Sequence, residues 1–139
     1  MPTYEKANVI TDHAARDHWL LSGSHKNRCA VCWRPWERAG WRGFAVHHLV
    51  RGANGRSDEP CNLLLLCADH HDHYHGAGII DSGGQRMPEL TFGMLLRIKM
   101  ESSEWDEKRL TALYHKRLPD MKPLPAYYLK ERERYEKHH

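Results

Sequence analysis

The pattern of apolar and polar positions predicts a strand–loop–strand–helix unit in the first half of the chain. Residues 44–50 combine aromatic and β-branched side chains in the manner of a short strand, and residues 62–66 form a second short apolar run. Between them, residues 51–60 are rich in Gly, Asn, Asp, Ser and Pro, which is typical of a loop. Residues 68–75 have a helical pattern that ends near two glycines. We therefore expect two short strands followed by a helix.

Helices are also predicted on both sides of this unit. Residues from about 12 to 21 have a helical pattern before it, and residues 91–101 have one after it. Ser103-Glu-Trp-Asp106 resembles a capping box that opens a further helix, and the charged residues 129–139 favour a solvated, fraying helix. The fold class is therefore α+β. We expect a single domain over residues 1–139, with its core at about 26–78 and a C-terminal helical extension over about 90–139.

Composition argues against a membrane protein. Of the 139 residues, 40% are hydrophobic and 28% are charged, which are the proportions of a soluble globular chain. The longest apolar run, residues 63–68, is far shorter than the roughly 20 residues that a membrane-spanning helix needs. The first six residues are not followed by the apolar region of a signal peptide. We therefore expect a cytoplasmic protein without a membrane partner.

Four residues have the spacing of a structural zinc site. Cys29-x2-Cys32 can present two thiolates to one Zn²⁺ from a single tight turn, and Cys67-x2-His70 has the matching spacing for two more ligands. A redox-active or merely buried CxxC is the alternative, but nothing around it resembles a thioredoxin motif. Cys61 is a rival ligand, although five residues separate it from Cys67 and no single turn presents such a pair. We predict a zinc ion held by three thiolates and one imidazole.

The spacing of the histidines in the predicted helix indicates a second metal site. At about 100° per residue, His71 and His75 lie about 40° apart on one face of the helix. His70 is turned back toward Cys67, and His73 falls on the opposite side, where we expect it to be solvated. His71 and His75 can therefore hold a second metal ion while His70 serves the zinc.

His47 and His48 are adjacent in a predicted strand, so their side chains point to opposite faces. They cannot easily share one role. One can ligate the metal that His71 and His75 hold, and the other can face a substrate. A single His is more often a packed or surface residue, but four at these spacings beside a zinc knuckle favour a functional site.

The order of these motifs resembles that of the HNH nucleases, which belong to the ββα-metal (His-Me finger) superfamily. The resemblance covers about residues 26–76. It is carried by Cys29-x2-Cys32, Val46-His-His-Leu-Val50 and Asn62-Leu-x-x-Leu-Cys67-x2-His-His71-x3-His75. The zinc knuckle is similar to that of small phage and restriction-type enzymes. The three-His site is most similar to the colicin-type DNases, whereas the commoner pattern has Asp at the position of His47.

This resemblance implies a role for each residue of the motif. It implies that His48 is the general base, that Asn62 braces the loop and orients the base, and that His47, His71 and His75 bind a catalytic metal. It also implies a ββα-metal core that hydrolyses DNA phosphodiester bonds in a bacterial cell or a phage-infected host. Three neutral imidazoles suit Mn²⁺, Co²⁺, Ni²⁺ or Zn²⁺ better than Mg²⁺, which prefers oxygen ligands and is the alternative metal.

The distribution of charge favours a nucleic-acid partner. Between residues 26 and 56 there are seven basic residues, one acidic residue and three Trp, although the net charge of the whole chain is only +3. Charge runs are in general more often solvated faces, but this one flanks the motif, so we expect phosphate contacts from Arg42, Arg51 and Arg56, above all from Arg51 or Arg56. Two alternatives to a DNA endonuclease stay open: a zinc-stabilised nucleic-acid-binding module without catalysis, and an RNase that uses the same site.

Overall fold

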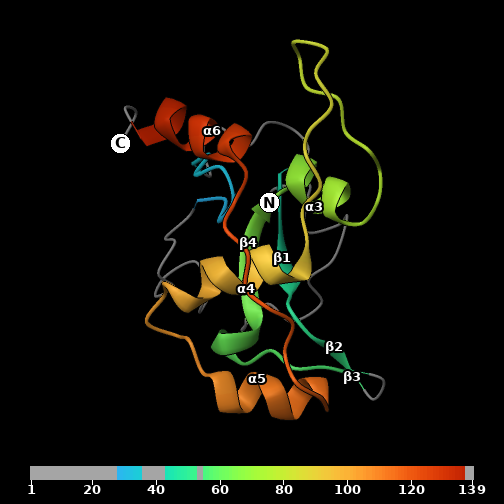
Figure 1. The fold of residues 1–139 in the computed structure, drawn as a ribbon, viewed down its shortest axis with the longest axis vertical. Helices are drawn as coiled ribbons and strands as arrows, with labels where there is room; N and C mark the ends of the chain where they lie inside the picture. Colours follow the sequence, from blue (N-terminus) through green and yellow to red (C-terminus); the bar gives the residue numbers. More distant parts are fainter. Residues whose placement is uncertain (1–27, 36–42, 53–54, 137–139) are drawn as a thin grey trace.

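The structure, a computed structural model, describes residues 28–35, 43–52 and 55–136, and the side chain of Arg56 is outside this description. The predicted helix over residues 12–21 also lies outside the described residues. The described elements follow one another as β1 (Phe44–His48), β2 (Arg51–Gly52), β3 (Gly55–Arg56), the 3₁₀ turn η2 (Pro60–Asn62), β4 (Leu63–Cys67), α3 (Ala68–Tyr74), α4 (Phe92–Met100), α5 (Glu107–Tyr114) and α6 (Ala126–Glu136) (Figure 1).

The centre of the molecule is an antiparallel pair of strands that leads directly into a helix. In the pair, Phe44 of β1 lies opposite Cys67 of β4, and His48 lies opposite Leu63. Every residue of both strands is buried, which explains why β4 and the first three residues of β1 are apolar without alternation, while His47 and His48 are the polar exceptions. β4 passes without a break into α3. The structure thus confirms the predicted ββα core, with a small β2–β3 hairpin inside the segment that was expected to be a loop.

The knuckle of residues 28–35 packs against the end of this core. An antiparallel bridge joins Arg28 to Pro35, and Trp33 closes the turn with a φ of 67°. The backbone N–H of Ala30 donates to the carbonyl of Leu65 at 2.7 Å, which ties the knuckle to β4. The knuckle therefore reaches the strand that ends at Cys67.

Helix α4 covers one side of the strand pair, and α5 packs against η2 and β2 at the end of the pair. α4 crosses β1 and β4 in Figure 1, and its Leu95 and Leu96 are fully buried. Thr91 caps α4 as its N-cap, in agreement with the predicted helix over residues 91–101. The expected capping box at Ser103 is wrong, because α5 begins at Glu107 and its N-cap is Asp106, whose side chain accepts from the N–H of Arg109.

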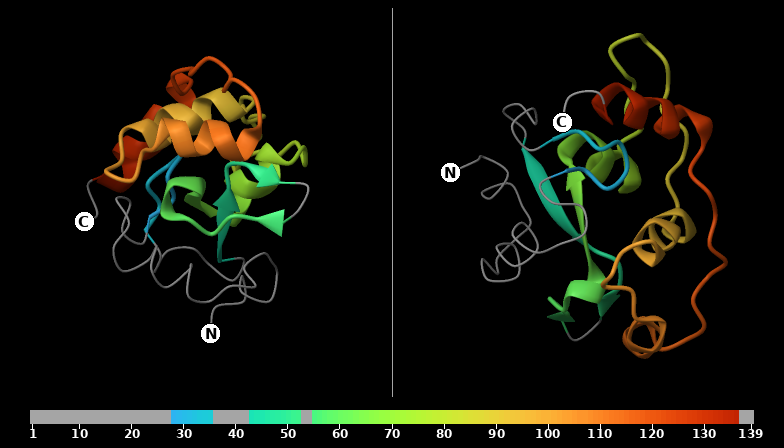
Figure 2. Two further views of the ribbon diagram at one scale, coloured as in Figure 1. Left: turned by 90° about the horizontal axis from the view of Figure 1, so that it is seen from below. Right: turned by 90° about the vertical axis from the view of Figure 1, so that its left-hand side faces the viewer.

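Helix α6 departs most from the sequence-based expectation. It was expected to be solvated, but Tyr128 and Tyr135 are buried on its inner face. The views in Figure 2 place α6 beside the knuckle and near α3. The sequence did not indicate this buried face because α6 is strongly charged. Arg and Glu side chains that contact the knuckle and α3 cannot be distinguished in sequence from Arg and Glu side chains that face water. Among the described residues, no helix is long and apolar enough to cross a membrane.

Candidate functional site

Three thiols and one imidazole converge where the knuckle meets α3. The ligand atoms of Cys29, Cys32, Cys67 and His70 all lie within 4.8 Å of one another, and all four residues are buried. Two of the cysteines come from the knuckle turn, while Cys67 ends β4 and His70 lies in the first turn of α3. This set of donors and its closed, buried arrangement fit a structural zinc site.

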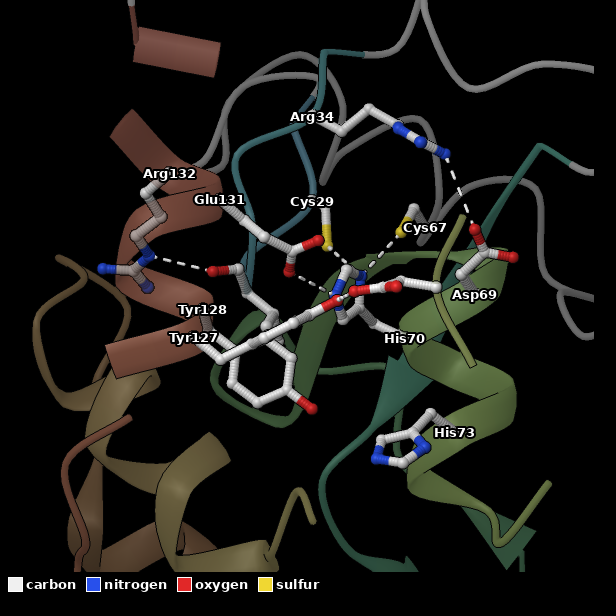
Figure 3. Close-up of polar contacts among 12 residues, drawn as sticks. Cys29, Arg34, Cys67, Asp69, His70, His73, Tyr127, Tyr128, Glu131 and Arg132 are labelled. Atoms are coloured by element: carbon white, nitrogen blue, oxygen red, sulfur yellow. Dashed lines mark hydrogen bonds and ion pairs between the residues drawn. The ribbon is translucent and has the colours of Figure 1, made fainter. Parts of the chain in front are cut away.

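The ring of His70 is held at both nitrogens. Its Nδ1 lies 2.9 Å from the sulfur of Cys67 and 3.9 Å from that of Cys29, so Nδ1 faces the thiols (Figure 3). Its Nε2 lies 2.9 Å from a carboxylate oxygen of Glu131 on α6. The nitrogen that can bind a metal is therefore Nδ1.

The electrostatics of the thiol cluster also fit a cation. Burial and the neighbouring sulfurs raise the pKa of Cys32 well above its ordinary value, and the hydrogen bond with Cys29 is the main cause that raises the pKa of Cys67. Burial also acts to raise the pKa of Cys29, but hydrogen bonds from both cysteines and His70 lower it well below its ordinary value. Because adjacent thiolates repel one another, only one sulfur carries the negative charge easily. A divalent cation at this point would let all three ionise.

Cys61, the rival ligand, is not part of this cluster. It lies buried in the 3₁₀ turn η2 before β4, and burial raises the pKa of its thiol. The cluster of ligand atoms contains Cys67 and His70 from this part of the chain. The geometry thus agrees with the choice of Cys67 over Cys61.

A second cluster brings together three imidazoles from β1 and α3. The ligand atoms of His47, His71 and His75 lie within 4.8 Å of one another. The ring centroid of His47 lies 5.7 Å from that of His71 and 5.5 Å from that of His75, and Tyr74 packs against His47 at 4.9 Å. Nε2 of His47 is buried without a hydrogen-bond partner among the described residues. A buried nitrogen without a partner beside two further imidazoles fits a metal ligand.

These imidazoles are kept neutral by their surroundings. Burial lowers the pKa of His47 well below its ordinary value, and His71 and His75 lower it further. Burial, followed by His75 and Arg51, lowers the pKa of His71 to about 4. Burial and Arg51 also lower the pKa of His75. Neutral imidazole is the form that binds a metal, so all three nitrogen donors are available at neutral pH.

His48 points to the other side of the strand, as the alternation along β1 predicts. Its Nε2 lies 2.7 Å from a carboxylate oxygen of Asp58. Asp58 was not among the site residues that the sequence predicted. Asp58 is an acidic residue four positions before Asn62, and this closeness to the motif was the only hint of a functional role. The local sequence does not indicate which histidine the Asp58 carboxylate contacts.

Asn62 fixes the loop that carries this pair. Its side-chain oxygen accepts from the N–H of Val50 at 2.8 Å, and its amide donates to the carbonyls of Val50 at 3.1 Å and Ser57 at 2.9 Å. Asn62 is fully buried, so these bonds satisfy its amide inside the core. It therefore braces the turn after His48 and the segment that presents Asp58.

Of the three arginines expected to contact phosphate, only Arg51 has a side chain that the structure describes. Arg51 is exposed, and its charge is among the causes that lower the pKa values of the three clustered histidines. Its guanidinium therefore acts on the three-His cluster itself. Arg42 and the side chain of Arg56 lie outside the described residues.

One histidine prediction is wrong. His73 was expected to be solvated, but its Nε2 lies 2.7 Å from the carbonyl of Pro88, and its Nδ1 accepts from the N–H of Ile79 at 3.2 Å. It ties α3 to both ends of the hairpin of residues 79–88, which one isolated antiparallel bridge between Ile80 and Arg86 closes. A structural role in the hairpin thus explains why this histidine belongs to neither metal cluster.

Comparison with known proteins agrees with this geometry. Residues 29–76 match the family model described as HNH endonuclease, which confirms the resemblance inferred from the motifs. The matched segment holds the knuckle, the strand pair and α3, and therefore both histidine-containing clusters. The match supports an enzyme of the nuclease type with a nucleic-acid substrate. No curated protein and no solved structure gave a significant match.

Proposed function

We propose that this protein is a metal-dependent endonuclease that hydrolyses phosphodiester bonds of DNA. The proposal rests on two groups of side chains that β1 places on its opposite faces. On one face His47 joins His71 and His75 in a metal-binding geometry, and on the other His48 is paired with Asp58. A nucleic-acid-binding module without catalysis would need neither arrangement.

In this proposal His48 is the general base. With Nε2–H donating to Asp58, the other ring nitrogen, Nδ1, is left to take a proton from the attacking water. The water oxygen then bonds to phosphorus while the bond from phosphorus to the 3′-oxygen breaks, and the resemblance to HNH nucleases implies 5′-phosphate and 3′-hydroxyl products. Asp58 fixes the orientation and tautomer of the imidazole, as the acid of a catalytic triad does.

The remaining residues hold the cation and the substrate. His47, His71 and His75 would bind a divalent metal, which supplies charge neutralisation at the phosphate and stabilisation of the leaving oxygen. Among the described residues no carboxylate belongs to this cluster, so Mn²⁺, Co²⁺, Ni²⁺ or Zn²⁺ should serve better than Mg²⁺. Arg51, exposed beside the cluster, would contact a phosphate.

The decisive experiment separates the adjacent histidines. His48→Ala should keep the fold, the zinc and the affinity for the second metal, while DNA cleavage falls by about 10²–10⁴-fold, the usual contribution of a positioned base. His47→Ala and His71→Ala should instead weaken metal binding, and excess metal should partly restore their activity. Such rescue should fail for His48→Ala, because a cation cannot accept a proton.

The measurements are calorimetric metal titration and a cleavage assay on the same samples, with DNA and RNA substrates in parallel. Normal cleavage by His48→Ala would refute the proposal. Loss of metal from His48→Ala with retention by His47→Ala would show that the two roles are exchanged. Cleavage of RNA but not DNA would favour the RNase alternative.

A further inference from the structure

Helix α6 contacts the zinc centre although it lies outside the segment that matches the HNH family. Glu131 reaches Nε2 of His70 at 2.9 Å, across 61 residues of sequence. The guanidinium of Arg132 donates at 2.9 Å to the carbonyls of Ala30 and Val31, the two residues between the knuckle cysteines. Figure 3 shows both side chains directed from α6 toward the knuckle and α3.

The contact between Glu131 and His70 has a specific chemical consequence. Nδ1 of His70 faces the thiols, so the proton of the neutral ring must be on Nε2, where it is donated to the Glu131 carboxylate. A carboxylate at this position fixes the ring orientation and makes the metal-binding nitrogen a stronger donor. His70 is 3% exposed and Glu131 is 17% exposed, so water competes little for this bond.

Two guanidinium groups lie near the charges of this centre, one from the knuckle and one from α6. Three thiolates exceed the charge of one Zn²⁺ by one, and the Glu131 carboxylate adds another negative charge. Arg132 interacts electrostatically with Cys29 and Cys32, and Arg34 does so with Cys32 and Cys67. These two guanidinium groups offset part of the excess negative charge, since Arg34 also lies 3.9 Å from Asp69 and Arg132 also interacts with Glu101. A carboxylate beside an anionic zinc centre is therefore accommodated.

We propose that Glu131 is a positioning residue for the zinc centre, and that α6 thereby contributes to this centre together with the three cysteines and His70. The inference rests on zinc being held by these four residues. It is independent of whether the three-His cluster supports cleavage, so a catalytically inactive protein would leave it intact.

The test compares three variants of the full chain. Glu131→Ala removes the acceptor, and Glu131→Gln keeps its size and one acceptor oxygen but removes the charge. Glu133→Gln is the matched control, because Glu133 is exposed on the same helix two residues away. Zinc affinity is measured by competition with a chromophoric chelator. The Co²⁺-substituted proteins give absorption bands that report the donor strength of the ligands.

We expect Glu131→Ala to weaken zinc binding by about 10–100-fold, the usual effect of losing such a partner, and Glu131→Gln to fall in between. The Co²⁺ bands should shift in both variants, and Glu133→Gln should match the unmodified protein in both measurements. A purely structural contact would leave the spectrum of Glu131→Gln unchanged. Unchanged affinity and spectra in both Glu131 variants would overturn the proposal, as would failure of the unmodified protein to bind zinc.

Discussion

Metal binding at the three-His cluster should release far fewer protons than three ordinary histidines would. An imidazole with its ordinary pKa near 6.5 is half protonated at pH 6.5, so three of them carry about 1.5 protons that a metal must displace. In this protein the pKa of His71 is lowered to about 4, and those of His47 and His75 are lowered as well. At pH 6.5 His71 then carries on the order of 0.003 protons.

The sign of the pH dependence follows from these lowered pKa values. A proton competes with a metal only below the pKa of the ligand, so lowering the pKa moves the competition to more acidic solutions. His47 and His71 are effectively neutral at pH 6.5, and His75, the most exposed of the three, contributes less than half a proton. We expect fewer than about 0.5 protons released per metal ion at pH 6.5. Affinity at this cluster should change little between pH 7.5 and pH 6, and should fall as the pH approaches about 4.

The assay is calorimetric titration of the zinc-loaded protein with Co²⁺ or Mn²⁺ in two buffers that differ in ionisation enthalpy. The difference between the observed enthalpies gives the number of protons released. His71→Ala is the control, because its affinity should fall at every pH. Release of about 1.5 protons at pH 6.5, with an affinity that declines around that pH, would refute the reasoning, since it would show that the three imidazoles are not desolvated.

Two further predictions concern residues outside the proposed catalytic groups. Lys99 is fully buried and donates to the carbonyl of Leu63 at 2.8 Å and to Glu104 at 2.6 Å, so Lys99→Met should lower the free energy of unfolding in urea by about 3 kcal/mol. Part of this loss should come from the Glu104 carboxylate, which loses its Lys99 partner, so the double variant Lys99→Met/Glu104→Gln should be more stable than Lys99→Met alone. Equal stability of the two variants would exclude this carboxylate as a cause of the loss. Cys61→Ser should retain zinc in a metal analysis, whereas Cys67→Ser should lose it and unfold, because structural zinc contributes roughly 10–16 kcal/mol of apparent binding free energy. The opposite pattern would make Cys61 the ligand.

The sequence by itself determined the features that depend on local spacing. The CxxC turn, the Cys-x2-His turn and the angular separation of His71 from His75 follow from the geometry of one turn of chain or helix. The aromatic and β-branched content of residues 44–50 and the apolar run of residues 62–66 predicted the strand pair, which the structure places at residues 44–48 and 63–67. The resemblance to HNH nucleases rests on these local spacings, and the match over residues 29–76 confirmed it.

The tertiary structure alone decided which polar side chains meet across long separations. Asp58 reaches His48 over a loop, and Glu131 reaches His70 over 61 residues, and neither contact leaves a periodic signal in the sequence. His73 and α6 were misjudged for the same reason. A histidine or a charged helix has the same sequence pattern whether its polar atoms meet water or a carbonyl, and only packing determines which partner they find.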